Sequence, residues 1–281
     1  MRHPVLAFLL LAPGFVAAPT YAQAVPAAPM LDRWEVVVAP GKCTLSRRYS
    51  QPAATRLTID TDVGTGDYSL SIAMPGLERQ PVGLPGEAVL KADRKTAARG
   101  FVTVFREGEA GAPLLANMAG LSAGAMTALA AARELSISGE QLRVKPLALP
   151  AAAQAMAALR TCENEQMVEW GADPAQFAPG GSMPRVRDLH ALLPQSALRK
   201  MPYPAGPANL MHVLVIDERG AVASCASSGA LVGAPLEKTV CAQLVGKVVG
   251  TPAKDPGGKP VRGVVGYFPA LIRSFIVQTP I

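Results

Sequence analysis

The sequence predicts an α+β protein made of a β-rich segment with one or two helices, followed by a small β-β-α-β domain. Two observations support this fold class. Short runs that alternate apolar and polar residues, separated by polar turns, fill the first part, and Ala-rich stretches with helical spacing follow them. In the second part, two apolar runs meet at an acidic-Gly turn and precede an amphipathic stretch and a last apolar run.

The N-terminus has the layout of a secretory signal peptide. A charged start at Arg2 precedes an apolar stretch from Pro4 to Ala18, and Ala22 and Ala24 form an A-x-A-like cleavage site. We therefore expect residues 1–24 to be removed and the mature chain to reside in the periplasm. The alternative is an uncleaved anchor, although the apolar stretch is shorter than the ~20 residues that a membrane-spanning helix needs.

Residues 25–172 are predicted to form the β-rich α+β domain, whose role the sequence does not reveal. Strands are expected in "RWEVVVAPGKCTLSRRYS", "TRLTID", "DYSLSIAM", "GFVTVFRE" and "QLRVKPLAL", which together predict an antiparallel sheet or a small sandwich. "SAGAMTALAAARELS" and "AAAQAMAALRTCENEQMVEW" are predicted helices, and Gly171 follows the second one as a C-terminal cap. Trp34 and Trp170 are predicted to be core aromatic residues.

Residues 173–183, rich in Pro and Gly, are the predicted linker, and residues 184–281 form the second domain. The net charge of +6 belongs to this domain, because it holds 11 basic and 5 acidic residues whereas the preceding residues hold 16 of each. Such a charge favours an acidic protein partner, anionic lipid headgroups or peptidoglycan. Nucleic acid is not an expected partner, because basic and aromatic residues are not interleaved.

The second domain resembles the C-terminal domain of TonB-type energy transducers. The resemblance follows "VLVIDERGAVASCASSG", "PLEKTVC" and "TPAKDPGGKPVRGVV", about a third of the chain. The residues that match the family pattern are Ser227, Ser228, Gly229, Leu236, Glu237, Pro252, Ala253, Gly258, Lys259, Pro260 and Val261. The chain departs from the family in lacking a Pro-rich spacer, in the inserted "ALVGAP" and in Gly250-Thr251, which stands where the family has an aromatic residue.

The resemblance implies a protein-binding module without enzymatic activity, cofactor or metal, linked to TonB-dependent transport. Its implied partner is an outer-membrane transporter or another envelope protein, bound by strand addition. The last strand is the expected edge, bordered by Arg262 and Arg273 and carrying Tyr267 and Phe268.

Four cysteines in an oxidising compartment favour two disulfides over free thiols or a metal site, and the sequence contains no C-x-x-C. Within the TonB-like domain, Cys225 would lie on the second strand and Cys241 on the helix that packs over it. By elimination, Cys43 then pairs with Cys162.

Two alternative functions remain open. "GLSAG" (residues 120–124) matches the G-x-S-x-G nucleophile elbow, so Ser122 could serve an envelope serine hydrolase with His190 or His212 as base. Ser122 is equally well suited to cap the following helix, and His212 to lie buried in an apolar strand. The other alternative is a structural protein that contacts peptidoglycan through its basic face.

Overall fold

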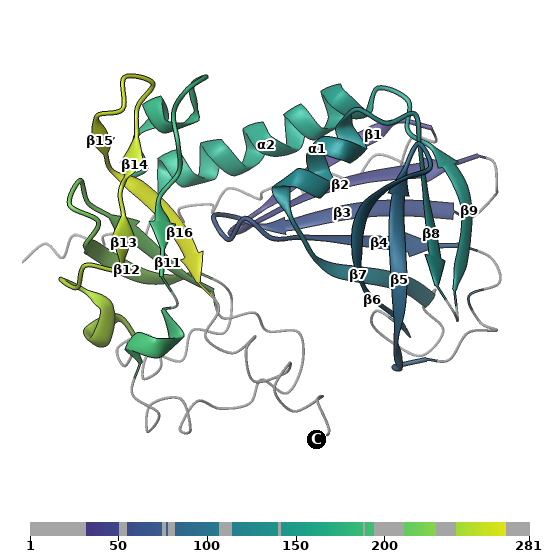
Figure 1. Ribbon diagram of the computed structural model, residues 1–281, viewed down its shortest axis with the longest axis horizontal. Coiled ribbons are helices and arrows are strands. Elements are labelled where there is room, and N and C mark those ends of the chain that lie inside the picture. Colours follow the sequence, from purple (N-terminus) through teal and green to yellow (C-terminus); the bar gives the residue numbers. More distant parts are fainter. Residues whose placement is uncertain are drawn as a thin grey trace, which may run out of the picture. The chain divides into compact units, whose positions relative to one another are not determined.

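The computed structural model describes residues 32–50, 55–74, 77, 82–106, 114–139, 142–187, 189–193, 211–228 and 240–267, which belong to one compact unit. The fold is α+β and rich in strands, as the sequence predicts (Figure 1). The signal peptide, Gly229, Leu236, Glu237, Phe268 and Arg273 lie outside the described residues.

The first part is a single antiparallel sheet of nine strands, in the order β1-β2-β3-β4-β7-β6-β5-β8-β9 among the described residues. The strands are β1 (Trp34–Ala39), β2 (Lys42–Tyr49), β3 (Thr55–Asp62), β4 (Tyr68–Ala73), β5 (Pro85–Ala92), β6 (Lys95–Arg106), β7 (Leu114–Leu121), β8 (Glu134–Gly139) and β9 (Arg143–Ala148). Two helices accompany them, α1 (Ala123–Ala130) and α2 (Ala152–Glu169). Alternation decides which face is buried: on β3, Leu57, Ile59 and Thr61 are buried and the residues between them are half-buried.

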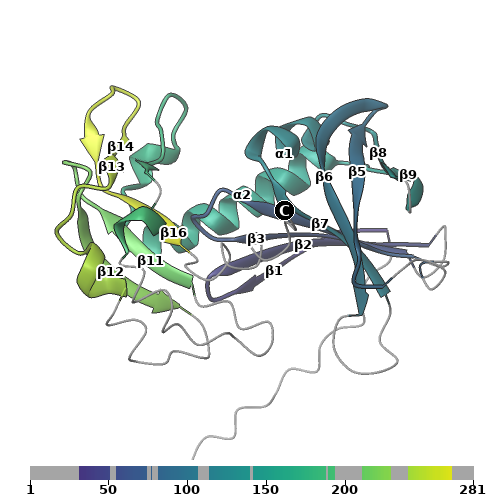
Figure 2. The ribbon, with the colours of Figure 1, turned by 60° about the horizontal axis from the view of Figure 1, so that its bottom comes forward.

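The sheet curls until its first and last strands approach each other. In Figures 1 and 2 the strands β5, β6, β8 and β9 run steeply across the direction of β1 to β3. Side chains join the two ends of the sheet: the Tyr49 hydroxyl donates to the Ala148 carbonyl at 2.8 Å, and the Trp34 indole N–H donates to the Pro150 carbonyl at 2.7 Å. The result is a curled sheet with a seam, because side chains rather than a backbone ladder connect these ends.

The sequence prediction for this part missed strands and made one helix too long. β5 and β7 were not predicted, and the helix expected over residues 122–136 ends at Ala130. Its predicted last turn is instead β8, where Leu135 and Ile137 alternate into the core and pair with Ala92 and Leu90 of β5. Tertiary pairing therefore overrides the helical propensity of the Ala-rich run.

The second part contains a three-stranded antiparallel sheet in the order β12-β11-β16. β11 (Met211–Ile216) and β12 (Val222–Ser228) form the predicted hairpin, and β16 (Gly263–Tyr267) pairs with the other side of β11. The Asp217 carboxylate shapes the hairpin turn by accepting the backbone N–H groups of Arg219 and Ala221, both at 2.9 Å.

The helix of the second part is shorter at its end than the sequence predicts. Residues 240–244 are helical, and Val240 and Leu244 are buried as expected. The helical spacing of "LEKTVCAQLVGKVV" predicts Val245 and Val248 on the same buried face. Both lie beyond the helix and are 49% and 60% exposed. The reason is Gly246, whose φ of +81° ends the helix and turns the chain.

Short pairings surround this sheet. β10 (Arg185–Val186) pairs with β13 (Gly250–Thr251), and β14 (Ala253–Lys254) pairs with β15 (Pro260–Val261). The predicted linker contains the 3-10 helix η2 (Pro174–Phe177), and a second one, η3 (His190–Leu192), follows β10. Ser182, within the predicted linker, exchanges two backbone hydrogen bonds with Lys254, both 2.9 Å long.

Alternating residues of the small sheet belong to two apolar clusters. Val213 and Val264 pack with the core of the nine-stranded sheet. Leu214, Ile216 and Val265 pack in a separate cluster with Val240, Leu244 and the residues around η3. β11 is therefore buried on both faces, which explains why it reads as a continuous apolar run.

Candidate functional site

The residues that carry the TonB-like pattern have structural positions. Pro252 and Ala253 lie on one arm of the β14–β15 hairpin, and Lys259, Pro260 and Val261 on the other, with Ala253 opposite Val261. The Gly- and Pro-rich stretch "GTPAKDPGGKPV" predicts a loop over this segment. The segment instead forms a hairpin, because the Asp255 carboxylate accepts the Lys259 N–H at 2.9 Å and Gly258 adopts a φ of +81°. Ser227 and Ser228 end β12.

The expected binding edge, β16, lies at one side of the small sheet, and one of its outward backbone groups already has a partner. The Gly266 N–H donates to the Gly64 carbonyl, in the turn between β3 and β4, at 3.0 Å. Just before the strand, the Arg262 carbonyl accepts the Asp173 N–H at 2.9 Å. A Cβ atom on Gly266 would lie 2.5 Å from the Val63 carbonyl oxygen, so this approach depends on glycine.

The two predicted edge residues that the structure describes differ in exposure. Arg262 is exposed, whereas Tyr267 is buried and lies opposite His212 of β11. Within residues 263–267, the Gly266 N–H is thus already bonded to a turn some two hundred residues earlier in the chain.

The opposite side of the sheet ends at β12, and the hydrogen-bond pattern shows which of its groups face outward. The N–H of Gly266 points away from β11, so its pair Val213 directs its backbone groups toward β12. The residue opposite Val213 is Ala226, which therefore bonds inward. Its neighbours Cys225 and Ser227 must then point their N–H and C=O groups outward. We call these outward groups of Cys225 and Ser227 the β12 edge.

The β12 edge has no strand partner among the described residues. At the start of strand β12, before this edge, the backbone groups of Val222 are already bonded. The Val222 N–H donates to the Lys247 carbonyl at 3.0 Å, and the Val222 carbonyl accepts the Gly246 N–H at 2.8 Å. Farther along, Ala223, Ser224 and Ala226 are exposed.

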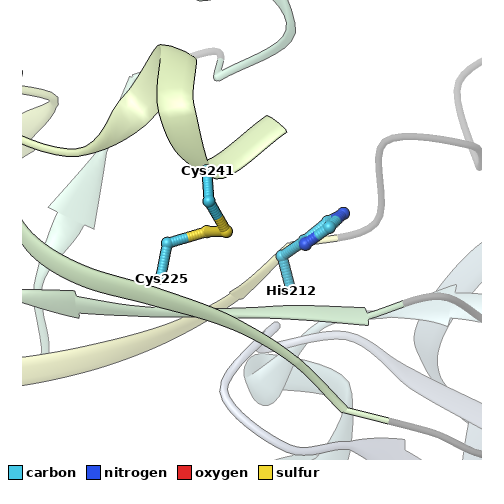
Figure 3. Close-up of side chains that lie close together, drawn as sticks. All are labelled: His212, Cys225 and Cys241. Atoms are coloured by element: carbon cyan, nitrogen blue, oxygen red, sulfur yellow. A yellow bond between two sulfur atoms is a disulfide. The ribbon is translucent and has the colours of Figure 1, made fainter. Parts of the chain in front are cut away.

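A buried histidine lies beside the disulfide of this sheet (Figure 3). His212 of β11 is fully buried, and its Nδ1 lies 3.0 Å from the Ser227 hydroxyl, its cross-strand neighbour. The imidazole and the sulfurs of Cys225 and Cys241 have ligand atoms within 4.8 Å of one another. With the sulfurs joined in a disulfide, no thiolate is present, and the imidazole is the one metal-ligating group of the three.

The hydrolase motif is located at a helix start. Ser122 is the N-cap of α1, and its hydroxyl accepts the Ala125 N–H at 3.3 Å. His212, one of the two histidines considered as its base, is engaged with Ser227 instead. The side chain of His190 lies outside the described residues. The geometry therefore supports the capping interpretation of Ser122.

Both predicted disulfides are confirmed. Cys43 on β2 is bonded to Cys162 on α2, and Cys225 on β12 to Cys241 in the helix over it. Two disulfides fit an oxidising compartment outside the cytoplasm. In the described part of the chain, no helix is both long and apolar enough to cross a bilayer.

A polar group is buried next to the first disulfide, between α2 and the sheet. The Glu163 carboxylate accepts the hydroxyl groups of Thr61 at 2.8 Å and Tyr68 at 3.0 Å. Burial raises the pKa of Glu163, and the two hydrogen bonds partly oppose this shift. All three side chains are nearly inaccessible to solvent, so we interpret this triad as a structural element that joins α2 to β3 and β4.

The structure also contains a pocket that the sequence did not predict. It has a volume of about 720 Å³ and lies at the seam, between β1–β2 and the start of α2. Trp34, predicted to be a core residue, is half-buried in its wall, beside the guanidinium of Arg47.

No family model matches the chain, and no similarity was found to a curated protein or to a solved structure.

Proposed function

We propose that this chain is a non-enzymatic protein-binding module of the periplasm that accepts an extended segment of a partner on the β12 edge. The partner is an outer-membrane transporter or another envelope protein, which would link the chain to TonB-dependent transport. The resemblance of residues 184–281 to the TonB C-terminal domain supports the mode of binding. The disulfides and the signal-like N-terminus support the compartment.

The observation that carries the proposal is the composition of β12. Exposed edge strands are commonly protected from pairing by a charge or a proline. β12 reads "VASCASS" and contains neither. Small side chains leave the backbone groups of Cys225 and Ser227 accessible to an added strand, and main-chain hydrogen bonds then supply most of the affinity.

The charge of this part of the chain selects the partner. Residues 184–281 contain 11 basic and 5 acidic residues, so an acidic peptide is attracted and a basic one repelled. Few side chains of β12 add contacts of their own, so we expect weak binding, with a Kd in the micromolar range or above. Raising the salt concentration should weaken it further.

An NMR titration of the ¹⁵N-labelled chain (residues 25–281) with acidic peptides from transporter N-termini tests the proposal. The amides of Cys225 and Ser227 should shift most. Ser227→Pro removes one outward N–H and should raise the Kd for the peptide at least tenfold. The matched variant Ser227→Ala removes only the hydroxyl, and its Kd should stay within twofold of that of the unmodified chain. The proposal fails if no amide shifts at millimolar peptide, or if both variants bind alike.

A further inference from the structure

We propose that the pocket at the seam of the sheet binds a small amphipathic carboxylate: the apolar body lies against the pocket wall and the carboxylate meets Arg47 and the N-terminus of α2. The volume of about 720 Å³ lies within the roughly 300–1,000 Å³ that is usual for ligand pockets. This site is separate from the β12 edge and needs no partner protein.

Arg47 is the first reason for an anionic ligand. Its side chain is on the buried face of β2, is only 7% exposed, and lies 5.7 Å and 5.2 Å from the ring centres of Trp34 and Tyr49. Its Nη1 donates to the Asp32 carbonyl at 2.6 Å, and its Nε has no hydrogen-bond partner among the described residues. A buried guanidinium is costly unless anionic groups or hydrogen-bond acceptors lie close to it.

Asp32 neutralises Arg47 only in part. Its carboxylate lies 3.7 Å from Nη2, is about half exposed, and also accepts the Ser50 N–H at 3.1 Å. Hydrogen bonds from Ser50 lower the pKa of Asp32, so this carboxyl group is ionised at neutral pH. Arg33 also lines the pocket.

The start of α2 is the second, independent reason. α2 has 18 residues, no side chain caps its first turn, and that turn has no acidic residue. Its N-cap, Ala151, adopts a left-handed φ of 55°, which is unusual for a residue other than glycine. Ala151 and Gln154 line the pocket, so the unsatisfied N–H groups and the positive end of the helix dipole lie at its wall.

The remaining lining residues are mostly apolar, which favours a ligand with an apolar body. Trp34, Val36 and Leu45 form the wall on the strand side, and the helix side presents the small residues Ala155 and Ala158. An inorganic anion would leave this surface wet. An alkyl chain attached to a carboxylate would bury it while the carboxylate meets the donors.

Isothermal titration calorimetry with octanoate tests the inference, with octanol as the uncharged ligand of the same length. Octanoate should bind the chain at least tenfold more tightly than octanol. Ala158→Leu fills the pocket from the exposed side of α2 and should weaken octanoate at least tenfold. The matched control is Ala157→Leu, which makes the same change at the neighbouring exposed position outside the pocket and should stay within twofold.

Arg47→Met keeps the length of the side chain and removes the charge. It should weaken octanoate binding at least tenfold and leave octanol binding within twofold, because only the carboxylate meets the guanidinium. Should this variant fail to fold, the two alanine positions and the octanol comparison still decide the question. The inference is wrong if millimolar octanoate gives no binding heat, if octanol binds as tightly as octanoate, or if the two leucine variants bind octanoate equally.

Discussion

Reduction of the two disulfides should cost different amounts of stability, and the chain allows each to be measured alone. In the loop-closure description, a disulfide restricts the unfolded chain more strongly when it closes a longer loop. Cys43 and Cys162 are separated by 119 residues in sequence, and Cys225 and Cys241 by 16. The first bond should therefore contribute about 5 kcal/mol to the free energy of unfolding and the second about 3 kcal/mol.

The assay compares oxidised and reduced forms of the same sequence. The double variant Cys225→Ala/Cys241→Ala retains only the long-loop disulfide, and Cys43→Ala/Cys162→Ala retains only the short-loop one. Each is unfolded with guanidinium chloride, with and without a phosphine reductant, and the two free energies are subtracted. Because the oxidised and reduced forms of each variant have the same sequence, the effect of the cavities left by the alanines on the free energy of unfolding cancels in the subtraction.

The reasoning is refuted if reduction costs the same in both variants, or costs more for the short loop. Either result would mean that native contacts around the sulfurs, rather than the unfolded chain, determine the contribution. The two disulfides do differ in their native contacts. Cys43 and Cys162 are buried against the Gln166 amide, whereas Cys225 and Cys241 are half-buried.

Three further predictions follow. Gly64→Ala and Gly66→Ala both place alanine at a positive φ, but only the first creates a clash: a Cβ on Gly64 would lie 2.8 Å from a backbone nitrogen of β16, whereas a Cβ on Gly66 meets nothing within 4 Å. Gly64→Ala should therefore lower the melting temperature more than Gly66→Ala does. Ser122→Ala should destabilise the chain by about 1 kcal/mol through loss of the cap, and a fluorophosphonate probe should label neither form; labelling that depends on Ser122 would revive the hydrolase. Because burial raises the pKa of Glu163, its stabilising contribution is present below the ordinary carboxyl pKa and is lost as pH rises through the raised value. The free energy of unfolding of Glu163→Gln should therefore depend less on pH above the ordinary carboxyl pKa, and an unchanged slope would contradict this.

Local patterns predicted the elements whose register follows from a turn. The β3–β4 and β11–β12 hairpins and α2 lie where alternation, turn residues and helical spacing put them. β5 and β7 were missed because their runs contain Gly, Ala and Lys and lack a clear β signal. Their strand state comes from pairing with β6, which no local propensity encodes.

One residue of the proposed ligand site could have been found from the sequence. Cys43, Leu45, Arg47 and Tyr49 alternate along β2 and share its buried face. An arginine in such a series signals a buried charge that needs an anionic partner. The pocket itself could not be predicted, because it forms where Trp34 meets Pro150, 116 residues away in sequence.

The free edge of the small sheet likewise depends on contacts between residues that are far apart in the sequence. A three-stranded sheet has two edge strands, and the sequence favoured the last strand for its basic border. Which edge is free depends on what covers the other, and here that is Gly64 in a turn of the first part. Glycines at both positions, 64 and 266, allow the two backbones to approach, so the covering of β16 is a property of the fold rather than of the strand. In the function that we propose, a partner strand adds to β12, where Cys225 is bonded to the helix over the sheet. Reducing this disulfide should therefore loosen the proposed site.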